Sequence, residues 1–472
     1  MDAQEECTKK SGHIYVQCIF AMLANFTFLI YGMESGWISP ITSLLQSDVS
    51  PAGYPLSSNE LSWTASVLGV TATIGVLSYS YIADHYGRKV GVLIVALLEV
   101  ISWTIRLSYT SLALLILARA IAGFAAGGCF NIIPMYVKEI SQENITGILG
   151  TFQMLMHTTG IFLMYVMGAY LDYTTVIIIV TGLSIVTLVA LTKAPESPAF
   201  LVKQDRIEHA LETVAFLRGL HKDDGIVQKL VDDMIKQENN FKLLPKITFI
   251  SILKNKSWRR GFIIIILLFT CYEINGAFVI VTFATKILAS TGIRFDISPE
   301  IQSFSFPVVM IFASLALTFC VEKCGRKPIL IATYSISALA MFALALMILA
   351  QKQYGNVPAW MPLIALIVAV AMYSSGVSPL SFIIMTEMFN FQIRAKVVGV
   401  VVTYAWFLTF VAQSTYTPIA ESMGDFAPFV FYGFVNLISV VFVILFLIET
   451  RGKTEEEIYR KDKRKSIELN PI

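Results

Sequence analysis

The chain contains the turn Asp84-His85-Tyr86-Gly87-Arg88-Lys89, which joins two long apolar runs. The turn recurs in the second half as Glu322-Lys323-Cys324-Gly325-Arg326-Lys327, with the acid, the glycine and the basic pair at the same spacing. Glycine permits the tight backbone turn that such a connection needs. The repetition predicts two halves that share one arrangement of helices.

The apolar runs on either side of these turns decide the fold class. Of 472 residues, 56% are hydrophobic and 14% are charged, whereas a soluble domain has about 25% charged residues. A run of about 20 apolar residues spans a membrane, and it must be helical because lipid offers the backbone no hydrogen-bond partner. We therefore predict an all-α membrane protein whose twelve transmembrane helices form two six-helix bundles. The runs cover residues 14–34, 61–83, 90–110, 112–137, 147–170, 172–193, 260–283, 300–320, 328–350, 359–386, 395–417 and 426–449.

A charged segment divides the apolar runs into two sets of six. Its apolar residues recur at helical spacing from Ile207 to Leu217 and again from Val227 to Met234, which predicts short helices on the membrane surface. We expect a first bundle, a helical linker, a second bundle and a tail. These parts cover residues 1–193, 194–258, 259–450 and 451–472.

Lysine and arginine gather in one set of loops and in both tails. Positive charge marks the cytoplasmic side of a membrane protein. We therefore expect a multi-pass protein of the plasma membrane with both termini in the cytoplasm. The segment before Ile14 is polar and no cleavage site follows the first run, so we interpret that run as a retained helix.

The remaining composition excludes several classes of function. The net charge of +2 is explained by topology, so we expect the lipid bilayer and a small solute as partners and no nucleic acid. No metal cluster, phosphate-binding loop or nucleophile triad stands out, so we predict no catalytic residue, no metal, no cofactor and no enzyme activity. The six cysteines lie in helices or on the cytoplasmic side, which predicts no disulfide framework.

Two acids end corresponding runs in the two halves, Glu139 in the fourth and Glu387 in the tenth. The basic pair of each turn can meet the acid that ends a neighbouring helix. This symmetry predicts a cytoplasmic ion-pair latch between the bundles. The alternative is that the charges only anchor loops.

Further motifs follow one another over nearly the whole chain. They are Gly36-Trp37-Ile38-Ser39-Pro40, Ser62-Trp63, Arg119 with Gly123 and Gly127, Pro134-Met135-Tyr136-Val137-Lys138-Glu139, Gln153 with Gly160, Pro195-Glu196-Ser197-Pro198, Glu387-Met388-Phe389, Arg394, Trp406 and Glu449-Thr450-Arg451-Gly452-Lys453-Thr454. Any one of these motifs alone is weak evidence for a protein family. Together with the two turns, they resemble the sugar porters of the major facilitator superfamily, and most resemble the insect branch that contains facilitated trehalose transporters.

The resemblance implies a substrate cavity near the middle of the membrane, reached by alternating access. In such porters an amide of span five hydrogen-bonds the sugar, because an amide both donates and accepts as a hydroxyl does. Tryptophans of spans ten and eleven pack on the apolar face of the ring. Gln153 and Trp406 fit these roles. The alternatives are a polar contact between helices for Gln153 and ordinary packing for Trp406.

The departures from the family point to an altered substrate. The family motif Gln-Gln-x-Ser-Gly-x-Asn is replaced by Tyr272-Glu273-Ile274-Asn275-Gly276-Ala277-Phe278, so three sugar-binding amides are absent. Phe382 stands where span ten usually has tryptophan. A site that loses hydrogen-bonding groups loses discrimination for a free hexose. We predict a hexose, a disaccharide or a glycoside, with Tyr272, Glu273, Phe278 and Phe382 in the site.

Charges inside the spans are candidates for function because they are costly there. Glu34 aligns with the aspartate of proton-coupled sugar porters, and the resemblance implies that it pairs with Arg119. Protonation would release the pair and link protons to substrate movement. The alternative is a static ion pair in a uniporter.

His157 lies one helical turn after Gln153 on the same face, and we interpret it as lining the cavity, with a structural role as the alternative. Glu99 and Arg106 lie two turns apart, and we expect them in a structural network with Arg119.

The resemblance also assigns gating to charges at the cytoplasmic ends of both halves. Thr146 and Ala199 stand where the family usually has arginine. The ion-pair latch of the first half therefore has fewer basic residues than is usual in the family. The predicted gating residues are Asp84, Arg88, Lys89, Glu139, Glu196, Glu322, Arg326, Lys327, Glu387 and Arg394.

We weigh transport of a sugar or sugar-like solute against two other functions. One is a non-transporting sugar sensor built on a transporter fold, and the segment after Lys453 is short for a signalling tail. The other is a porter of a non-sugar metabolite.

Overall fold

Helices account for the regular structure of the chain, and none of the described residues forms a β-strand. The computed structural model describes residues 13–108, 111–243, 248–290, 297–355, 357–358, 360–389 and 391–451. Twelve stretches are long and apolar enough to cross a membrane, and each overlaps one of the predicted runs. The predicted all-α membrane fold with twelve spans is confirmed.

The helices of the first half are α2 (Tyr15–Gly36), α3 (Ile38–Leu45), α4 (Ser58–His85), α5 (Arg88–Leu107), α6 (Leu112–Ile140), α7 (Glu143–Tyr170) and α8 (Tyr173–Leu191). The segment after them holds α9 (Pro198–Lys203), α10 (Ile207–Arg218), α11 (Gly225–Leu243) and α12 (Phe249–Lys254). The second half holds α13 (Lys256–Glu273), α14 (Ala277–Thr282), α15 (Ala284–Ser290), α16 (Pro299–Ser303), α17 (Ser305–Cys324), α18 (Arg326–Tyr354), α19 (Trp360–Met372), the π-helix η1 (Tyr373–Val377), α20 (Ser378–Met388), α21 (Phe391–Met423) and α22 (Ala427–Leu445).

Local chemistry explains several helix ends. The hydroxyl of Ser111 accepts a hydrogen bond from the backbone N–H of Leu114 and caps α6. Asn255 caps α13 in the same way, since its side-chain oxygen accepts from Ser257 and Trp258. Such caps satisfy N–H groups that have no partner inside the helix.

The predicted short helices of the linker are present as α10 and α11. Both bury an apolar stripe, and the residues of that stripe pack with α9 in a small cluster of their own. Its buried members are Leu201, Val202, Ala210, Val214, Ala215, Val227 and Val231.

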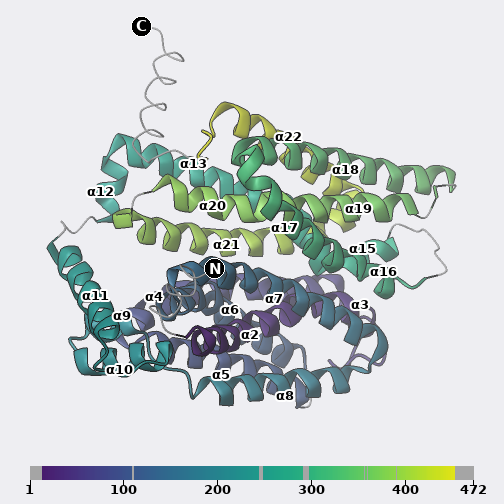
Figure 1. Ribbon diagram of the computed structural model, residues 1–472. Helices are drawn as coiled ribbons and strands as arrows, with labels where there is room; N and C mark the ends of the chain where they lie inside the picture. The colour runs from purple at the N-terminus through teal and green to yellow at the C-terminus, as the bar shows by residue number, and fades with distance from the viewer. Residues whose placement is uncertain are drawn as a thin grey trace, which may run out of the picture. The chain divides into compact units, whose positions relative to one another are not determined.

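The chain divides into two compact units. Unit 1 comprises residues 1–34, 71–160 and 174–246, and unit 2 comprises residues 35–70, 161–173 and 247–472. In unit 1, α5 packs along α6; in unit 2, α18 packs along α22 and α19 (Figure 1). The predicted division into bundles, linker and tail remains a prediction.

Unit 2 includes the ends of several first-half helices. The backbone N–H of Thr285 donates to the hydroxyl of Ser39 (3.2 Å), and the hydroxyl of Thr285 donates to the backbone oxygen of Ser39. Tyr165, near the end of α7, donates to the backbone oxygen of Val281. These bonds join α3 to α15 and the end of α7 to α14 within one unit.

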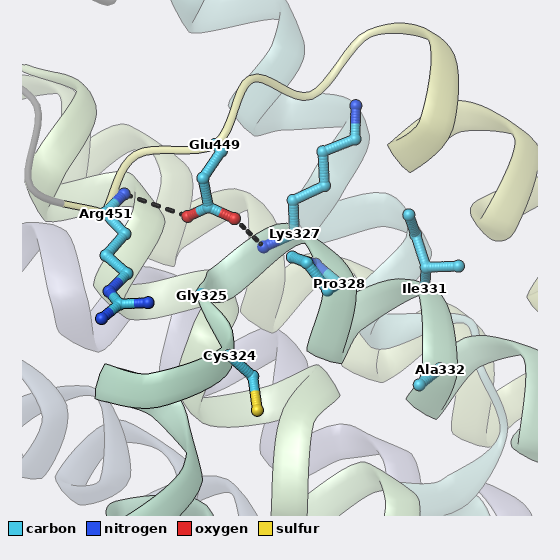
Figure 2. Close-up of a pocket in the computed structure, with 8 residues that line it drawn as sticks. All are labelled: Cys324, Gly325, Lys327, Pro328, Ile331, Ala332, Glu449 and Arg451. Carbon is cyan, nitrogen blue, oxygen red and sulfur yellow. Dashed lines mark hydrogen bonds between the residues drawn. The ribbon is translucent and has the colours of Figure 1, made fainter.

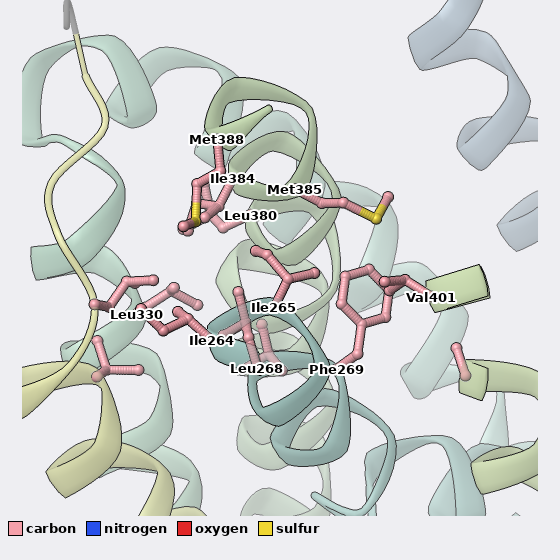
Figure 3. Packing of buried hydrophobic residues seen from close by; sticks show 14 of the residues in the cluster. Ile264, Ile265, Leu268, Phe269, Leu330, Leu380, Ile384, Met385, Met388 and Val401 are labelled. Atoms are coloured by element: carbon pink, nitrogen blue, oxygen red, sulfur yellow. The ribbon is translucent and has the colours of Figure 1, made fainter. Parts of the chain in front are cut away.

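The core of unit 2 is formed by α13, α18, α20 and α21 (Figure 3). Ile265, Leu268 and Leu330 are fully buried there, as are Ile384 and Val401. Each large aliphatic side chain buried in such a core contributes about 1.5–3 kcal/mol in water, although lipid lowers the contribution of apolar burial for a membrane span. This core fixes the end of α13, where the candidate site begins.

Candidate functional site

The first charged turn is held by acids from two other segments of unit 1. The guanidinium of Arg88 lies 2.8 Å from the carboxylate of Glu139. The backbone N–H groups of Arg88 and Lys89 donate to one oxygen of Glu196, at 2.9 and 3.0 Å. The hydroxyl of Ser197 donates to Glu139.

The second turn repeats this arrangement in unit 2. Arg326 lies 3.0 Å from Glu387. The backbone N–H groups of Arg326 and Lys327 donate to Glu449 at 3.0 and 2.9 Å. Figure 2 shows the bond from Lys327. The hydroxyl of Thr450 donates to Glu387 at 2.5 Å. The two networks therefore match residue for residue, with Glu449 using both carboxylate oxygens where Glu196 uses one.

The glycine of each turn is required by its backbone conformation and by its neighbours. Gly87 has a φ of +101° and Gly325 a φ of +86°, in the region that favours glycine. A Cβ atom at Gly87 would lie 2.3 Å from the carboxylate of Glu196, and one at Gly325 would lie 2.8 Å from that of Glu449. A side chain at either position would displace the acid that closes the turn.

The structure brings together the predicted partners inside each half and adds residues that we did not assign to the gate. Glu449 and Thr450 match Glu196 and Ser197, so the overlooked signal was an acid followed by a hydroxyl residue after span six and again after span twelve. Pairing within each half is what the structure describes. A latch between the bundles remains a prediction.

Two of the other predicted gating residues lie apart from these networks. Asp84 pairs with Lys203 at 2.9 Å on an exposed surface. Arg394 is exposed and donates to the backbone oxygen of Phe389 at 3.0 Å. The side chain of Glu322 lies outside the described residues, as does the tail from residue 452 onward.

Glu34, at the end of α2, is held by two arginines. Both terminal nitrogens of Arg106 donate to the two oxygens of Glu34, each at 2.6 Å. Arg119 donates at 2.7 Å to the carboxylate and at 2.7 Å to the backbone oxygen of Glu34. All three residues are buried, and Trp103 lies 4.3 Å from the Arg106 guanidinium. The expected contact between Glu34 and Arg119 is present, and Arg106 is a second partner that the family resemblance did not indicate.

The expected network of Glu99 and Arg106 with Arg119 is only half correct. Arg106 joins Arg119 through Glu34, whereas Glu99 accepts a hydrogen bond from the thiol of Cys129 at 3.7 Å. The second oxygen of Glu99 is buried without a hydrogen-bond partner among the described residues. A spacing of two turns placed both side chains on one helix face, but packing gave them different partners.

Gln153 and His157 lie on one face of α7 in unit 1. Gln153 is buried, and the ring of His157 stacks on Tyr31 with centroids 4.9 Å apart. The helices α2 and α7 touch here, because a Cβ atom at Gly32 would lie 2.0 Å from the backbone oxygen of His157. The stacking partner of His157 therefore depends on a glycine in the facing helix.

Span seven is interrupted where the family motif departs. The helix α13 ends at Glu273, and α14 begins after Gly276, which has a φ of +90°. The side-chain oxygen of Asn275 accepts from the backbone N–H of Ala277 at 2.8 Å, and its backbone oxygen accepts from Asn436 at 3.0 Å. An interrupted span leaves backbone groups and side chains near mid-membrane, as transporter sites often do.

Aromatic side chains surround this interruption. The rings of Tyr272 and Tyr373 stack with centroids 5.8 Å apart, and their hydroxyls are 3.2 Å apart. Phe382 meets Tyr272 edge to face at 5.9 Å and Phe269 at 5.1 Å. We call Tyr272, Tyr373, Phe269 and Phe382 the aromatic cluster.

Phe269 and Tyr373 are the two residues of this cluster that we did not predict, and Tyr373 has the more unusual position. It opens the π-helix η1, and such a single wide turn inside a span is frequent at functional sites. Gly376 within it packs closely on Thr333, since a Cβ atom there would lie 2.5 Å away. Gly376 and Pro379 lie inside an apolar run, and they were the sequence signal that could have indicated the irregular turn at Tyr373.

The remaining predicted site residues lie in the same unit. Glu273 is buried and accepts a hydrogen bond from the hydroxyl of Thr409 on α21 at 2.8 Å. Trp406 is buried on the same helix, three residues earlier. Phe278 is half-buried in the first turn of α14, and its backbone oxygen accepts from Thr282.

This combination of twelve spans, repeated charged turns and an interrupted span seven matches a known family. The sequence matches the family described as sugar (and other) transporter over residues 18–461. The chain belongs to this family. The predicted resemblance is thereby confirmed.

Relatives of this sugar transporter chain include two insect proteins. It is 24% identical to the facilitated trehalose transporter Tret1 of Polypedilum vanderplanki, over 95% of this chain and 88% of that protein. It is 24% identical to the protein of the same name in Anopheles gambiae, over 95% of this chain and 56% of that one.

The structural comparison confirms the major facilitator fold. The inward-open xylose transporter XylE from E. coli superimposes with a TM-score of 0.77 at 19% identity, over 95% of this chain and 100% of that one. A D-xylose–proton symporter superimposes with a TM-score of 0.71 at 20% identity, over 92% and 98% of the two chains.

Proposed function

We propose that the chain carries a sugar or sugar-like solute across the plasma membrane by alternating access. Family membership supports transport, and the relatives named for trehalose and xylose make a sugar the first candidate. The observation that carries the substrate proposal is the aromatic cluster beside the buried Glu273, where the family has three amides.

The chemistry of these residues favours a solute with an apolar face. Aromatic rings pack on C–H surfaces and on other rings, while a carboxyl oxygen of Glu273 accepts from a hydroxyl, as it does from Thr409. Gln153 of unit 1 remains a predicted substrate contact through its own amide, which both donates and accepts. Glycosides with an apolar group, and disaccharides that offer the rings a larger C–H face, fit this mixture better than free hexoses.

Uptake of radiolabelled solutes into oocytes that express the chain tests this proposal. The panel contains glucose, xylose, trehalose and a phenyl glucoside, each measured at two external pH values. We expect the disaccharide or the glycoside to be transported best. No uptake of any solute above that of control oocytes, with the protein shown at the cell surface, would favour a sugar sensor or a porter of another metabolite.

Proton coupling through Glu34 and Arg119 is a second part of the proposal. Glu34 is bonded to two buried arginines, so its protonation would remove the negative charge that both guanidinium groups contact. Such a state is costly unless the helices move, and this cost would link protonation to a conformational change. The name of the D-xylose–proton symporter supports coupling by analogy.

The test is accumulation against a gradient. We expect acidic medium to speed uptake, a protonophore to reduce accumulation, and Glu34→Gln to abolish accumulation while exchange continues. Uptake that is insensitive both to external pH and to a protonophore would leave Glu34 as a structural ion pair in a uniporter.

The charged turns are proposed to control the access equilibrium, with both termini in the cytoplasm. Arg88→Ala and Arg326→Ala each remove a partly buried pair, and we expect both to favour the inward-open state. Arg394→Ala is the matched control, because Arg394 is exposed and outside both networks. Cysteine accessibility from the cytoplasmic side measures the shift. Equal accessibility in all three variants would reduce the turns to loop anchors.

A further inference from the structure

Two exposed cysteines lie at the end of α17. Cys320 and Cys324 are both exposed and are one helical turn apart, so they share a helix face. The apolar run of this helix ends in the sequence just before Glu322, which places Cys320 at the end of the run and Cys324 one helical turn beyond it. The other described cysteines are buried or partly buried, at Cys18, Cys129 and Cys271.

The row of residues that leads to these cysteines faces outward. Phe312, Ala316 and Cys320 are spaced four apart along α17, and each is exposed. Phe312 is 68% exposed, which suits a side chain that lies in lipid rather than in protein. The thiol of Cys320 therefore continues a lipid-facing row to the membrane surface.

A groove begins where this row ends. It has a volume of about 590 Å³ and is lined by Cys324 on one side and by Pro328, Ile331 and Ala332 of α18 on the other (Figure 2). The three α18 residues are spaced three and four apart, so they form one continuous apolar strip. A chain attached at Cys324 would lie along this strip.

The polar groups at the rim of the groove already have partners. Glu449 accepts from the backbone N–H groups of Arg326, Lys327 and Arg451. The ammonium group of Lys327 donates to two backbone oxygens, and Arg451 donates to the backbone oxygen of Lys323 at 2.6 Å. An apolar occupant therefore fits this groove better than a phosphate group.

We propose that Cys324, with Cys320 as a second acceptor, carries a long-chain fatty acyl group in thioester linkage, and that the acyl chain lies in this groove. Cysteines beside a membrane span are common acceptors of such groups. The inference rests on the proposed orientation, because the acyl donor is a cytoplasmic coenzyme A thioester. The exposed Lys323 lies between the two thiols and attracts the phosphates of that donor.

The reaction is a transfer between two thiols. The sulfur of Cys324 attacks the carbonyl carbon of the acyl-coenzyme A, a new carbon–sulfur bond forms, and the bond to the coenzyme sulfur breaks. The proton lost by Cys324 ends on the coenzyme thiol, and nothing is oxidised or reduced. The product places an acyl chain along the apolar strip of α18, next to Gly325 and Glu449.

Metabolic labelling with alkyne-tagged palmitate tests the proposal on the full chain in cultured cells. We expect label on the wild-type protein that neutral hydroxylamine removes, because hydroxylamine cleaves thioesters. Cys324→Ser should lose most of the label, and the double variant with Cys320→Ser should lose all of it. Cys18→Ser and Cys271→Ser are matched controls that should keep the full label.

Label that survives in the double variant, or wild-type protein without label in cells whose other acylated proteins are labelled, would overturn the proposal. Mass spectrometry of the purified wild-type chain keeps the test independent of variant folding. The peptide that contains Cys324 should carry a hydroxylamine-sensitive acyl mass, and a fully alkylated free thiol there would contradict it. Neither readout requires transport, so a failure here is distinct from a failure of the proposed transport function.

Discussion

Glu34 in unit 1 and Glu273 in unit 2 are both buried, and the two carboxylates have opposite surroundings. Glu34 in unit 1 is bonded to Arg106 and Arg119 at 2.6–2.7 Å. Glu273 in unit 2 accepts from the hydroxyl of Thr409, and no cation among the described residues pairs with it. One carboxylate belongs to a closed ion cluster, whereas the other sits among hydroxyls and rings.

The difference separates two kinds of buried acid. A carboxylate between two guanidiniums has all its strong partners inside the protein, so a ligand can reach it only by breaking ion pairs. A carboxyl group with a single hydroxyl partner can exchange that partner for a hydroxyl of a solute. We therefore expect Glu34 to govern stability and coupling, and Glu273 to govern substrate choice.

The largest effect expected from this comparison is on stability. Glu34→Gln leaves two buried arginines without a counterion and should lower the free energy of unfolding by roughly 3–5 kcal/mol. Glu273→Gln should change it by less than about 1 kcal/mol, because the amide oxygen still accepts from Thr409. Thermal unfolding of the purified variants in one detergent measures both. Equal losses of unfolding free energy in the two variants would contradict the difference proposed between Glu34 and Glu273.

The next effect is on substrate preference. The triple variant Tyr272→Gln, Glu273→Gln and Phe278→Asn restores the three family amides and should raise hexose uptake relative to the glycoside at least about tenfold, or 1.4 kcal/mol. Glu34→Gln is the control and should leave the ratio unchanged. Competition between the two solutes at the cell surface measures the ratio. An unaltered ratio in a properly delivered triple variant would mean that these side chains do not line the cavity.

The aromatic cluster gives an intermediate effect. Tyr373→Phe removes the hydroxyl 3.2 Å from that of Tyr272 but keeps the stacked ring. Tyr373→Ala removes both and should weaken uptake of the glycoside by about 0.5–1.5 kcal/mol more than Tyr373→Phe does, the usual value of an aromatic pair. Concentration dependence of uptake measures the difference. Identical behaviour of the two variants would show that the ring is not used.

The smallest effect concerns the hydroxyl that holds Glu273. Thr409→Val removes the hydroxyl that donates to Glu273 among the described residues and should change substrate affinity by about 1 kcal/mol, the net value of one hydrogen bond. Thr403→Val is the control, because Thr403 lies on the same helix and donates only to the backbone oxygen of Gly399. A larger effect at Thr403 than at Thr409 would remove the special role of Glu273.

The separation of residues along the sequence explains which features could be predicted. The spans and the turns follow from runs and spacings that lie within a few residues of one another. The partners of buried charges do not, because Arg106 is 72 positions from Glu34 and Thr409 is 136 positions from Glu273. The wrong expectation for Glu99 has this cause: helix spacing placed it beside Arg106 on α5, and the thiol of Cys129 on α6 bound it instead.

The twelve spans, the twofold repeat and the family can be predicted from the amino-acid sequence, because lipid forces every apolar run into a helix and the charged turns recur at fixed spacing. Three contacts emerge only from the folded structure: Glu34 has two arginine partners, Glu449 closes the second turn, and the π-helix brings Tyr373 onto Tyr272. These contacts depend on how separate helices rotate and approach one another. Packing sets those angles, and no local pattern of residues encodes them.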